Sequence, residues 1–158
     1  MRKIPVIIDC DTGIDDMISF VLTLASKQLD IRGVTTVAGN VSLPYTTYNT
    51  VNGLAFMGRS EVLVAAGEAA PLERPYRDAS EIHGDSGLGA FSFENPVDYG
   101  PVETGGVEFL YEKLMESEEK ITILALAPLT NIAKLFLEHP DCKEKIEKIV
   151  FMGGSIFS

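Results

Sequence analysis

The sequence predicts an α/β fold with an open, mainly parallel, Rossmann-like sheet that has helices on both faces. Short apolar runs rich in β-branched residues alternate along the chain with longer stretches of helical periodicity. Strands that are separated by helices pair in parallel through right-handed crossovers. The chain has 158 residues, of which 46% are hydrophobic, and this is enough for one domain with a real core.

The first part of the chain predicts three strands. A strand is expected at residues 4–8, followed by a helix from residue 15 whose apolar Ile18, Val21, Leu22 and Ala25 recur at i, i+3, i+4 and i+7. A second strand is expected at residues 31–37, a helix at about 45–57 and a third strand at 62–66. Residues 67–100 are rich in Gly, Pro, Asp and Ser and exceed the usual length of a connecting loop.

The second part of the chain predicts two more strands. A helix from residue 104 carries Val107, Leu110, Tyr111 and Leu114 at the same helical spacing. A fourth strand is expected at residues 121–125, a helix at 129–138 that Pro140 ends, and a fifth strand at 149–152. If the strand order is 3-2-1-4-5, strands one and four flank the point where the order reverses, and open α/β sheets bind ligands there.

The most informative motif is an acidic cluster directly after the first strand. Asp9, Asp11, Asp15 and Asp16 crowd into eight residues, and Gly13 permits a tight turn among them. Carboxylates at this density raise one another's pKa unless a cation neutralises them, and their oxygens suit Ca²⁺ or Mg²⁺. The cluster therefore predicts a divalent cation site, with a solvated helix-capping turn as the alternative.

Two other acidic motifs fit the cluster less well. An EF-hand loop that started at Asp9 would need an oxygen ligand at position 5, Gly at 6 and Glu at 12, where this chain has Gly13, Ile14 and Phe20. The Asp-x-Asp-x-Thr motif of aspartyl-phosphate phosphatases is matched only weakly, because Thr12 comes one residue early. The spacing therefore excludes the first motif and disfavours the second.

The full pattern Asp-x-Asp-x-Gly-x-Asp-Asp resembles the signature of the inosine-uridine preferring nucleoside hydrolases, which cleave the N-glycosidic bond of ribonucleosides. Four later segments resemble motifs of the same family in the same order, at residues 35–40, 83–89, 127–131 and 150–154. The resemblance spans the whole chain, and five ordered motifs are far more specific than any one of them. It implies a nucleoside hydrolase-like fold and hydrolysis of ribonucleosides to free base and ribose.

The resemblance also implies a Ca²⁺ site and a general base. Asp11 matches the residue that contacts Ca²⁺ and accepts a proton from the metal-bound water. Asp16 and the backbone carbonyl of Leu126 match further Ca²⁺ ligands. Asp9 is not expected to bind the ion itself. It is expected to lie next to the ligands and to orient them.

Three more residues match positions that bind the substrate in the family. Asp15 matches the residue that binds the ribose hydroxyls, and Asn40 and His83 match other substrate-binding positions. The alternative for His83 is a loop histidine with a structural hydrogen bond. The alternative for Asn40 is a turn residue, because Gly-Asn is common in turns.

Composition restricts the classes of partner. A formal net charge of −10 argues against a nucleic-acid surface, and no segment has the roughly 18 uninterrupted apolar residues of a membrane helix. The basic start is followed by Asp9 and Asp11, which interrupt any signal-peptide core, so a cytoplasmic location is expected. Cys10 and Cys142 are expected to be reduced thiols. A small-molecule ribonucleoside is the expected partner, and a homo-oligomer is compatible with the sequence.

Members of the family are longer than this chain. Beyond the strand that ends in Met-Gly-Gly they carry an Asn, a Glu and Asn pair, and a late His-Asp, and none of these can be matched here. Residues 1–158 are therefore expected to form the N-terminal part of a single nucleoside hydrolase domain, truncated before those residues. Two hypotheses follow: a ribonucleoside hydrolase that is active when complete, or a non-catalytic Ca²⁺- or ribose-binding remnant.

Overall fold

The computed structural model describes residues 2–154, which form a five-stranded parallel sheet between two layers of helices. The strand order is β3-β2-β1-β4-β5, the order considered above for the location of a ligand site, and the predicted α/β fold class is confirmed. The strands are β1 (Ile4–Cys10), β2 (Leu29–Thr36), β3 (Val64–Ala66), β4 (Ile121–Ala125) and β5 (Ile146–Phe151).

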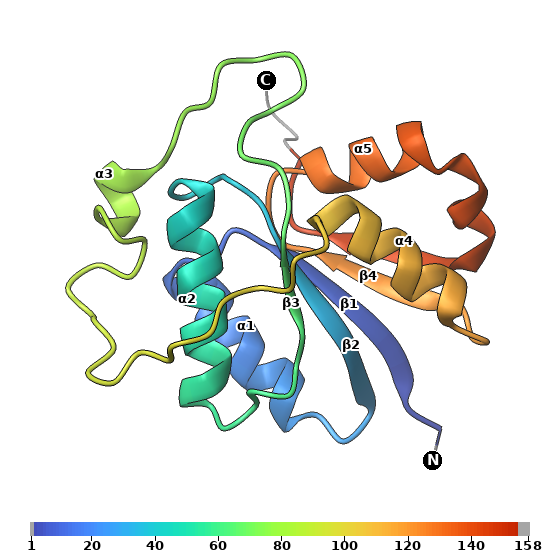
Figure 1. The fold of residues 1–158 in the computed structure, drawn as a ribbon, viewed down its shortest axis with the longest axis horizontal. Helices are drawn as coiled ribbons and strands as arrows, with labels where there is room; N and C mark the ends of the chain where they lie inside the picture. The colour runs from blue at the N-terminus through green and yellow to red at the C-terminus, as the bar shows by residue number, and fades with distance from the viewer. Residues whose placement is uncertain (1, 155–158) are drawn as a thin grey trace.

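Two pairs of helices cover opposite faces of the sheet (Figure 1). The first pair is α1 (Ile14–Ala25) and α2 (Leu43–Phe56), and the second is α4 (Gly106–Glu116) and α5 (Thr130–Glu138). Successive side chains of β1 point to opposite faces, so Ile8 packs under α1 and α2 while Ile7 packs under α4 and α5. In residues 2–154, no helix is long and apolar enough to cross a membrane.

Some boundaries differ from the predicted ones. β1 continues to Cys10, so Asp9 lies within the strand and not in the turn. β5 begins three residues early, at Ile146, because an edge strand tolerates the charged Glu147 and Lys148 that interrupt its apolar run. The short helices α3 (Ser80–His83) and η1 (Pro140–Lys145) were not predicted.

The apolar pattern of α1 identified the helix but not its buried face. Ile18, Val21 and Leu22, which recur at helical spacing, are exposed. Phe20 is fully buried instead, and Met17 packs beside it in the core between α1, α2 and the sheet. Because the helix is apolar on both sides, hydrophobic periodicity could not choose between them.

The long connection between β3 and α4 is tied to the rest of the molecule at several points. The backbone N–H of Ala79 donates to the carbonyl of Asn40 at 2.9 Å, just before α3. Near the other end, Val102 N–H donates to the carbonyl of Val64 at 2.8 Å, and this contact covers the outer edge of β3. Cys10 and Cys142 are buried, free thiols.

Candidate active site

A cavity of about 340 Å³ lies at the carboxyl ends of β1 and β4. Asp11, Asp15, Asn40 and Leu126 line it, together with residues 127–129 and 151–154. Asp11 follows β1, Asn40 follows β2 and Leu126 follows β4, so the parallel arrangement of the strands brings these distant residues together. This is the end of an α/β sheet at which ligands bind.

The Asp11 carboxylate is held by the turn that follows β2. The backbone N–H of Asn40 donates to Asp11 Oδ2 at 2.7 Å, and Asn40 Nδ2 donates to the Asp11 carbonyl at 3.3 Å. Gly39 allows this approach, because a Cβ at that position would collide with the Asp11 carboxylate. Burial raises the pKa of Asp11, while the hydrogen bond from Asn40 opposes that rise.

Asp9 lies under the cavity and is fully buried. Its Oδ1 accepts hydrogen bonds from Thr35 Oγ1 at 2.6 Å and from Asn131 Nδ2 at 2.7 Å, whereas its Oδ2 has no partner in the described part of the chain. Burial raises the pKa of Asp9 to about 6. Asp9 lies in β1 and does not line the cavity. This position is compatible with the predicted role of orienting the residues that do.

Asn131 links the ends of four strands, a role that the sequence reasoning missed. Besides its bond to Asp9, its Nδ2 donates to the carbonyl of Thr36 at 3.0 Å, and its Oδ1 accepts from the backbone N–H of Glu68 at 2.9 Å. Gly67 makes room for this side chain, because a Cβ there would overlap it. The only sequence signal was the position of Asn131 at the end of the motif at residues 127–131.

Asp15 and Asp16 are neighbours in the first turn of α1 but differ in environment. Asp15 is exposed and faces the cavity, whereas Asp16 is buried and its Oδ2 accepts from the backbone N–H of Gly13 at 3.0 Å. Burial, together with the charges of Asp11 and Asp15, raises the pKa of Asp16 to about 7. A negative charge on Asp16 is therefore unfavourable unless a cation lies close by.

His83 lies beside the turn that carries the acidic cluster and is not one of the cavity-lining residues. A Cβ on Gly13 would come within 2.8 Å of both His83 Nδ1 and Asn40 Nδ2, so Gly13 lets the three residues approach closely. His83 Nδ1 is buried and has no hydrogen-bond partner among residues 2–154. A polar atom buried in this way is available to a ligand.

The acidic residues supply some, but not all, of the ligands that a hard cation needs. Asp11, Asp16 and the Leu126 carbonyl offer oxygen ligands, which Ca²⁺ prefers, and the raised pKa values of the two carboxyl groups show that positive charge would stabilise them. Within residues 2–154, however, no group of three or more His, Cys, Asp or Glu side chains could hold a metal ion. A cation bound to these residues would need further ligands.

We expect Asp16→Asn to stabilise the metal-free protein at pH 8 but not at pH 4. The folded-state pKa of about 7 lies above the ordinary value of 3.8, so the charge of Asp16 opposes folding increasingly as the pH rises from 4 to 7. At about 1.4 kcal/mol per pKa unit, the effect is on the order of a few kcal/mol. Thermal unfolding with a chelator at both pH values measures it.

Asp15→Asn is the matched control, because Asp15 is exposed. It should change the melting temperature at pH 8 much less than Asp16→Asn does. A lower melting temperature for Asp16→Asn at pH 8 would contradict the prediction. Asparagine keeps an acceptor for the Gly13 N–H, so loss of that bond would not account for such a result.

Helix α2 supports the acidic turn with buried polar side chains that the sequence reasoning also missed. Thr50 Oγ1 lies 2.6 Å from Thr12 Oγ1, and Asn49 Nδ2 donates both to the Thr12 carbonyl at 3.1 Å and to the Ser86 carbonyl at 2.7 Å. Asn49 thereby connects the turn to the loop that follows His83. The sequence did contain a signal of this supporting role: α2 is rich in threonine and asparagine, which are poor helix formers.

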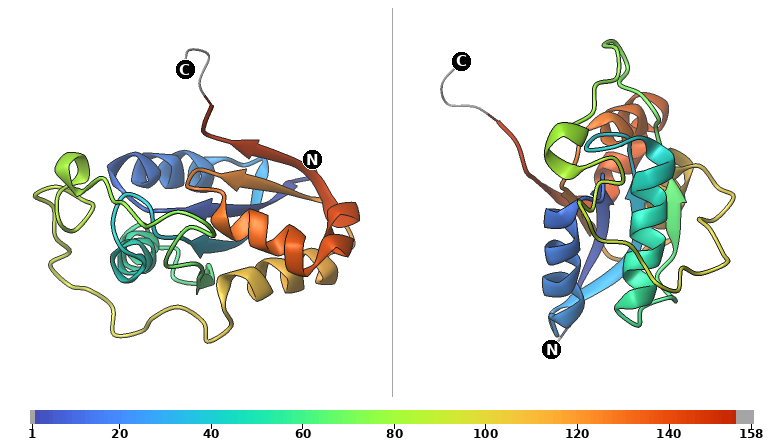
Figure 2. Two further views of the ribbon diagram at one scale, coloured as in Figure 1. Left: turned by 90° about the horizontal axis from the view of Figure 1, so that it is seen from above. Right: turned by 90° about the vertical axis from the view of Figure 1, so that its left-hand side faces the viewer.

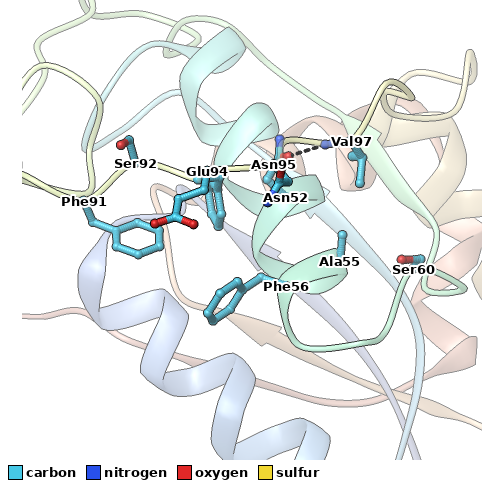
Figure 3. A pocket seen from close by; sticks show the side chains of 10 residues that line it. Asn52, Ala55, Phe56, Ser60, Phe91, Ser92, Glu94, Asn95 and Val97 are labelled. Carbon is cyan, nitrogen blue, oxygen red and sulfur yellow. Dashed lines mark hydrogen bonds between the residues drawn. The ribbon is translucent and has the colours of Figure 1, made fainter.

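A larger cavity of about 480 Å³ lies elsewhere, between α2 and residues 91–97 (Figure 3). Phe56, Phe91 and Phe93 contribute apolar walls, and the backbone N–H of Val97 donates to Asn52 Oδ1 at 2.9 Å. Of the described residues that line it, Glu94 alone is ionisable. The chemistry therefore points to the smaller cavity, where the carboxylates gather.

Known proteins resemble this chain in sequence. The sequence profile of the family described as inosine-uridine preferring nucleoside hydrolase matches residues 6–158. The pyrimidine-specific ribonucleoside hydrolase RihA of Escherichia coli O1:K1 is 39% identical over 153 residues, which are 97% of this chain and 49% of that protein. The protein of the same name in Citrobacter koseri is 40% identical over the same share of each chain. The chain thus spans about half the length of these relatives.

Solved structures agree with the sequence comparison. A plant nucleoside hydrolase superposes with a TM-score of 0.91 at 36% identity, over 98% of this chain and 49% of that one. A purine-preferring ribonucleoside hydrolase from Gardnerella vaginalis superposes with a TM-score of 0.90 at 27% identity, over 96% of this chain and 49% of the other. The match of the family profile to nearly the whole chain and the shared fold lead to one conclusion: this chain belongs to the inosine-uridine preferring nucleoside hydrolase family.

Proposed function

We propose that this chain provides the acidic catalytic site of a Ca²⁺-dependent ribonucleoside hydrolase, which releases a free base and ribose. The observation that carries the proposal is the cavity in which Asp11 and Asp15 lie next to Asn40 and Leu126. The family and the names of its ribonucleoside-hydrolysing members support it. A cytoplasmic setting, expected from the sequence, stays a prediction, and a role in nucleoside salvage is part of this proposal.

Asp11 is the proton acceptor in this proposal. Its carboxylate lines the cavity, is fixed by the backbone N–H of Asn40, and has a raised pKa, which makes it a stronger base than an exposed aspartate. As the N-glycosidic bond breaks, the base leaves with the bonding electron pair and takes up a proton from solvent, while positive charge develops on the sugar ring, where the negative charge of Asp15 would stabilise it. A water molecule that gives its proton to Asp11 would then add to the anomeric carbon and complete the ribose product.

Asp11, Asp16 and the carbonyl of Leu126 are the residues assigned to hold Ca²⁺. Bound there, the ion would supply Lewis acidity that makes a water molecule easier to deprotonate. Asp15 is exposed at the cavity and is assigned to the ribose hydroxyls. Asn40 is assigned to the substrate through its side chain, and His83, with its unpartnered Nδ1, is assigned to the substrate from the adjoining loop.

The proposed substrate class is the ribonucleosides, without a choice of base. The E. coli relative is named as pyrimidine-specific, whereas the G. vaginalis structure is named as purine-preferring. Uridine and inosine are therefore both used as substrates in the experiment described next.

The test uses a chimera, defined as residues 1–158 followed by the part of E. coli RihA that this chain does not match. We expect the chimera to release uracil or hypoxanthine in Ca²⁺, and we expect a chelator to stop the reaction and added Ca²⁺ to restore it. Chromatography of the free base measures the rate. A folded chimera that releases no base from any ribonucleoside would refute the proposal.

A non-catalytic binding domain is the second candidate function. It is favoured by the lack, within residues 2–154, of a third acidic side chain placed to complete a cation site. Calorimetric binding of ribose or Ca²⁺ by a chimera that never hydrolyses a ribonucleoside would support this second function over the first.

A further inference from the structure

The position of His83 depends on a loop and not on the sheet. His83 ends the short helix α3, and residues 83–89, which we call the His83 loop, form a turn directly after it. The backbone N–H of Gly89 donates to the His83 carbonyl at 2.8 Å, and that of Gly87 donates to the Gly84 carbonyl at 3.1 Å. These bonds lie within the loop, so they hold its shape but do not fix it to the rest of the molecule.

Asn49 of helix α2 anchors the His83 loop. Its side chain is 1% exposed, and its Nδ2 donates to the Ser86 carbonyl at 2.7 Å and to the Thr12 carbonyl at 3.1 Å. An amide nitrogen carries two N–H groups, so both are used. Within residues 2–154, the bond to Ser86 is the only hydrogen bond between the His83 loop and a residue outside 79–91. One side chain thus ties the loop to the acidic turn after β1.

The loop packs most closely on this anchor at Gly87. A Cβ on Gly87 would lie 2.9 Å from Val41 Cγ2 and 3.1 Å from Asn49 Nδ2, both closer than an ordinary contact. Gly87 also has a φ of +84°, which glycine adopts more easily than other residues do. The next residue, Leu88, is buried. Both views in Figure 2 place α3, which leads into the loop, beside α1 and α2.

The anchor matters because the His83 ring has little else to fix it. Its Nδ1 is buried and has no hydrogen-bond partner in the described part of the chain. The ring lies so close to Gly13 and Asn40 that a Cβ on Gly13 would come within 2.8 Å of Nδ1 and of Asn40 Nδ2. The place of the ring beside the acidic turn therefore depends on where the backbone of the His83 loop is held.

We infer that Asn49 is a positioning residue, which holds the His83 loop against the acidic turn and thereby places His83 at the candidate active site. The inference rests on the proposed function in one respect, since His83 is assigned there to the substrate. The Asp11 carboxylate is held separately, by the backbone N–H of Asn40. Loss of the Asn49 anchor should therefore weaken substrate binding more than it slows proton transfer.

The first experiment observes His83 by NMR in the untagged 158-residue chain. Labelling with ¹³C at histidine Cε1 gives two signals, because the sequence contains only His83 and His139. We expect Asn49→Leu, which keeps a side chain of similar size but removes both N–H groups, to move or broaden the His83 signal. The His139 signal should stay unchanged, because that ring stacks on Tyr111 and its Nε2 lies 2.8 Å from Glu108 Oε2. A His139→Gln variant assigns the two signals.

Asn52→Leu is the matched control. Asn52 lies on the same helix, is 5% exposed and makes two hydrogen bonds, to the Tyr48 carbonyl and from the Val97 N–H, neither of them with the His83 loop. Loss of either asparagine leaves backbone groups without a partner, so both variants should lower the melting temperature, by about 2–10 °C. Only Asn49→Leu should change the His83 signal, which separates positioning from a general loss of stability.

A second variant approaches the same contact from the loop and serves if Asn49→Leu does not fold. In Gly87→Ala the added methyl group would push the loop away from Asn49 and leave the side chains of α2 unchanged. It should alter the His83 signal as Asn49→Leu does. Gly58→Ala is its control, because Gly58 has a φ of +70° but no atom of residues 2–154 lies within 4 Å of a Cβ there.

Kinetics of the chimera give the second readout. Asn49→Leu should raise KM for inosine or uridine about five- to tenfold, the effect of losing one good hydrogen bond to the substrate, and should lower kcat less than it raises KM. A fall in kcat without a rise in KM would overturn the inference.

Two NMR results would also overturn it. One is a His83 signal that is unchanged in the folded Asn49→Leu and Gly87→Ala variants, and the other is an equal change in Asn52→Leu. The NMR experiment uses neither nucleoside nor Ca²⁺. A chimera that hydrolyses nothing, together with a His83 signal that responds as expected, would therefore refute the proposed function and leave the anchoring role of Asn49 standing.

Discussion

Asp11→Ala is expected to lower kcat of the chimera for uridine or inosine by about 10²–10⁴-fold or more. Loss of a general base alone typically has an effect of that size, and Asp11 is assigned both the proton and a contact with Ca²⁺. Asp16 is buried with its Oδ2 bonded to Gly13, and Asp9 does not line the cavity, so neither is placed to take over the proton. Asp15 lines the cavity but is assigned to the ribose hydroxyls. Steady-state kinetics with saturating Ca²⁺ measures the change.

Asp9→Asn is the comparison variant and should impair the reaction less. Its Oδ1 can still accept from Thr35 and Asn131, and the residue does not line the cavity. Circular dichroism and melting temperature establish that both variants are folded. If Asp11→Ala kept more than about a tenth of the parent kcat, Asp11 could not be the proton acceptor, since general-base loss costs more than that.

Gly39→Ala is expected to reduce activity nearly as far as Asp11→Ala, although it adds only one methyl group. That group would occupy the space of the Asp11 carboxylate, so either the carboxylate or the turn after β2 must move. Movement of either would disrupt the hydrogen bond from the Asn40 N–H to Asp11 Oδ2. A misplacement of about 1 Å in a catalytic group can cost on the order of 10²-fold in rate.

Gly100→Ala is the matched control, because no atom of residues 2–154 lies within 4 Å of a Cβ at that position. It should leave kcat close to that of the parent chimera. Equal activity of Gly39→Ala and Gly100→Ala would show that Asp11 tolerates displacement. It would then be wrong to assign the turn after β2 a role in holding the catalytic carboxylate.

The sequence by itself determined the succession of strands and helices and the end of the sheet at which the acidic residues lie. The alternation of apolar runs and helical periodicity reflects local backbone preference, which depends on neighbouring residues, so it can be read directly from the chain. The Asp cluster after the first strand and Asn40 after the second were placed at one end of the sheet because parallel strands align their carboxyl ends. The extent of β5 was less predictable, since the edge position that permits Glu147 and Lys148 is set by strands far away in sequence.

Only the tertiary structure decided which groups support the site and which side of α1 is buried. Asn131 bonds to Asp9 across 122 positions of sequence, and Asn49 bonds to Ser86 across 37, so no local pattern could pair them. Gly39 looked like an ordinary turn residue until the structure placed the Asp11 carboxylate against it. Both sides of α1 are apolar, and burial of Phe20 over Ile18 depends on which elements pack against the helix. These hydrogen-bond partners and the buried side of α1 depend on long-range packing, which the spacing of residues in the sequence does not specify.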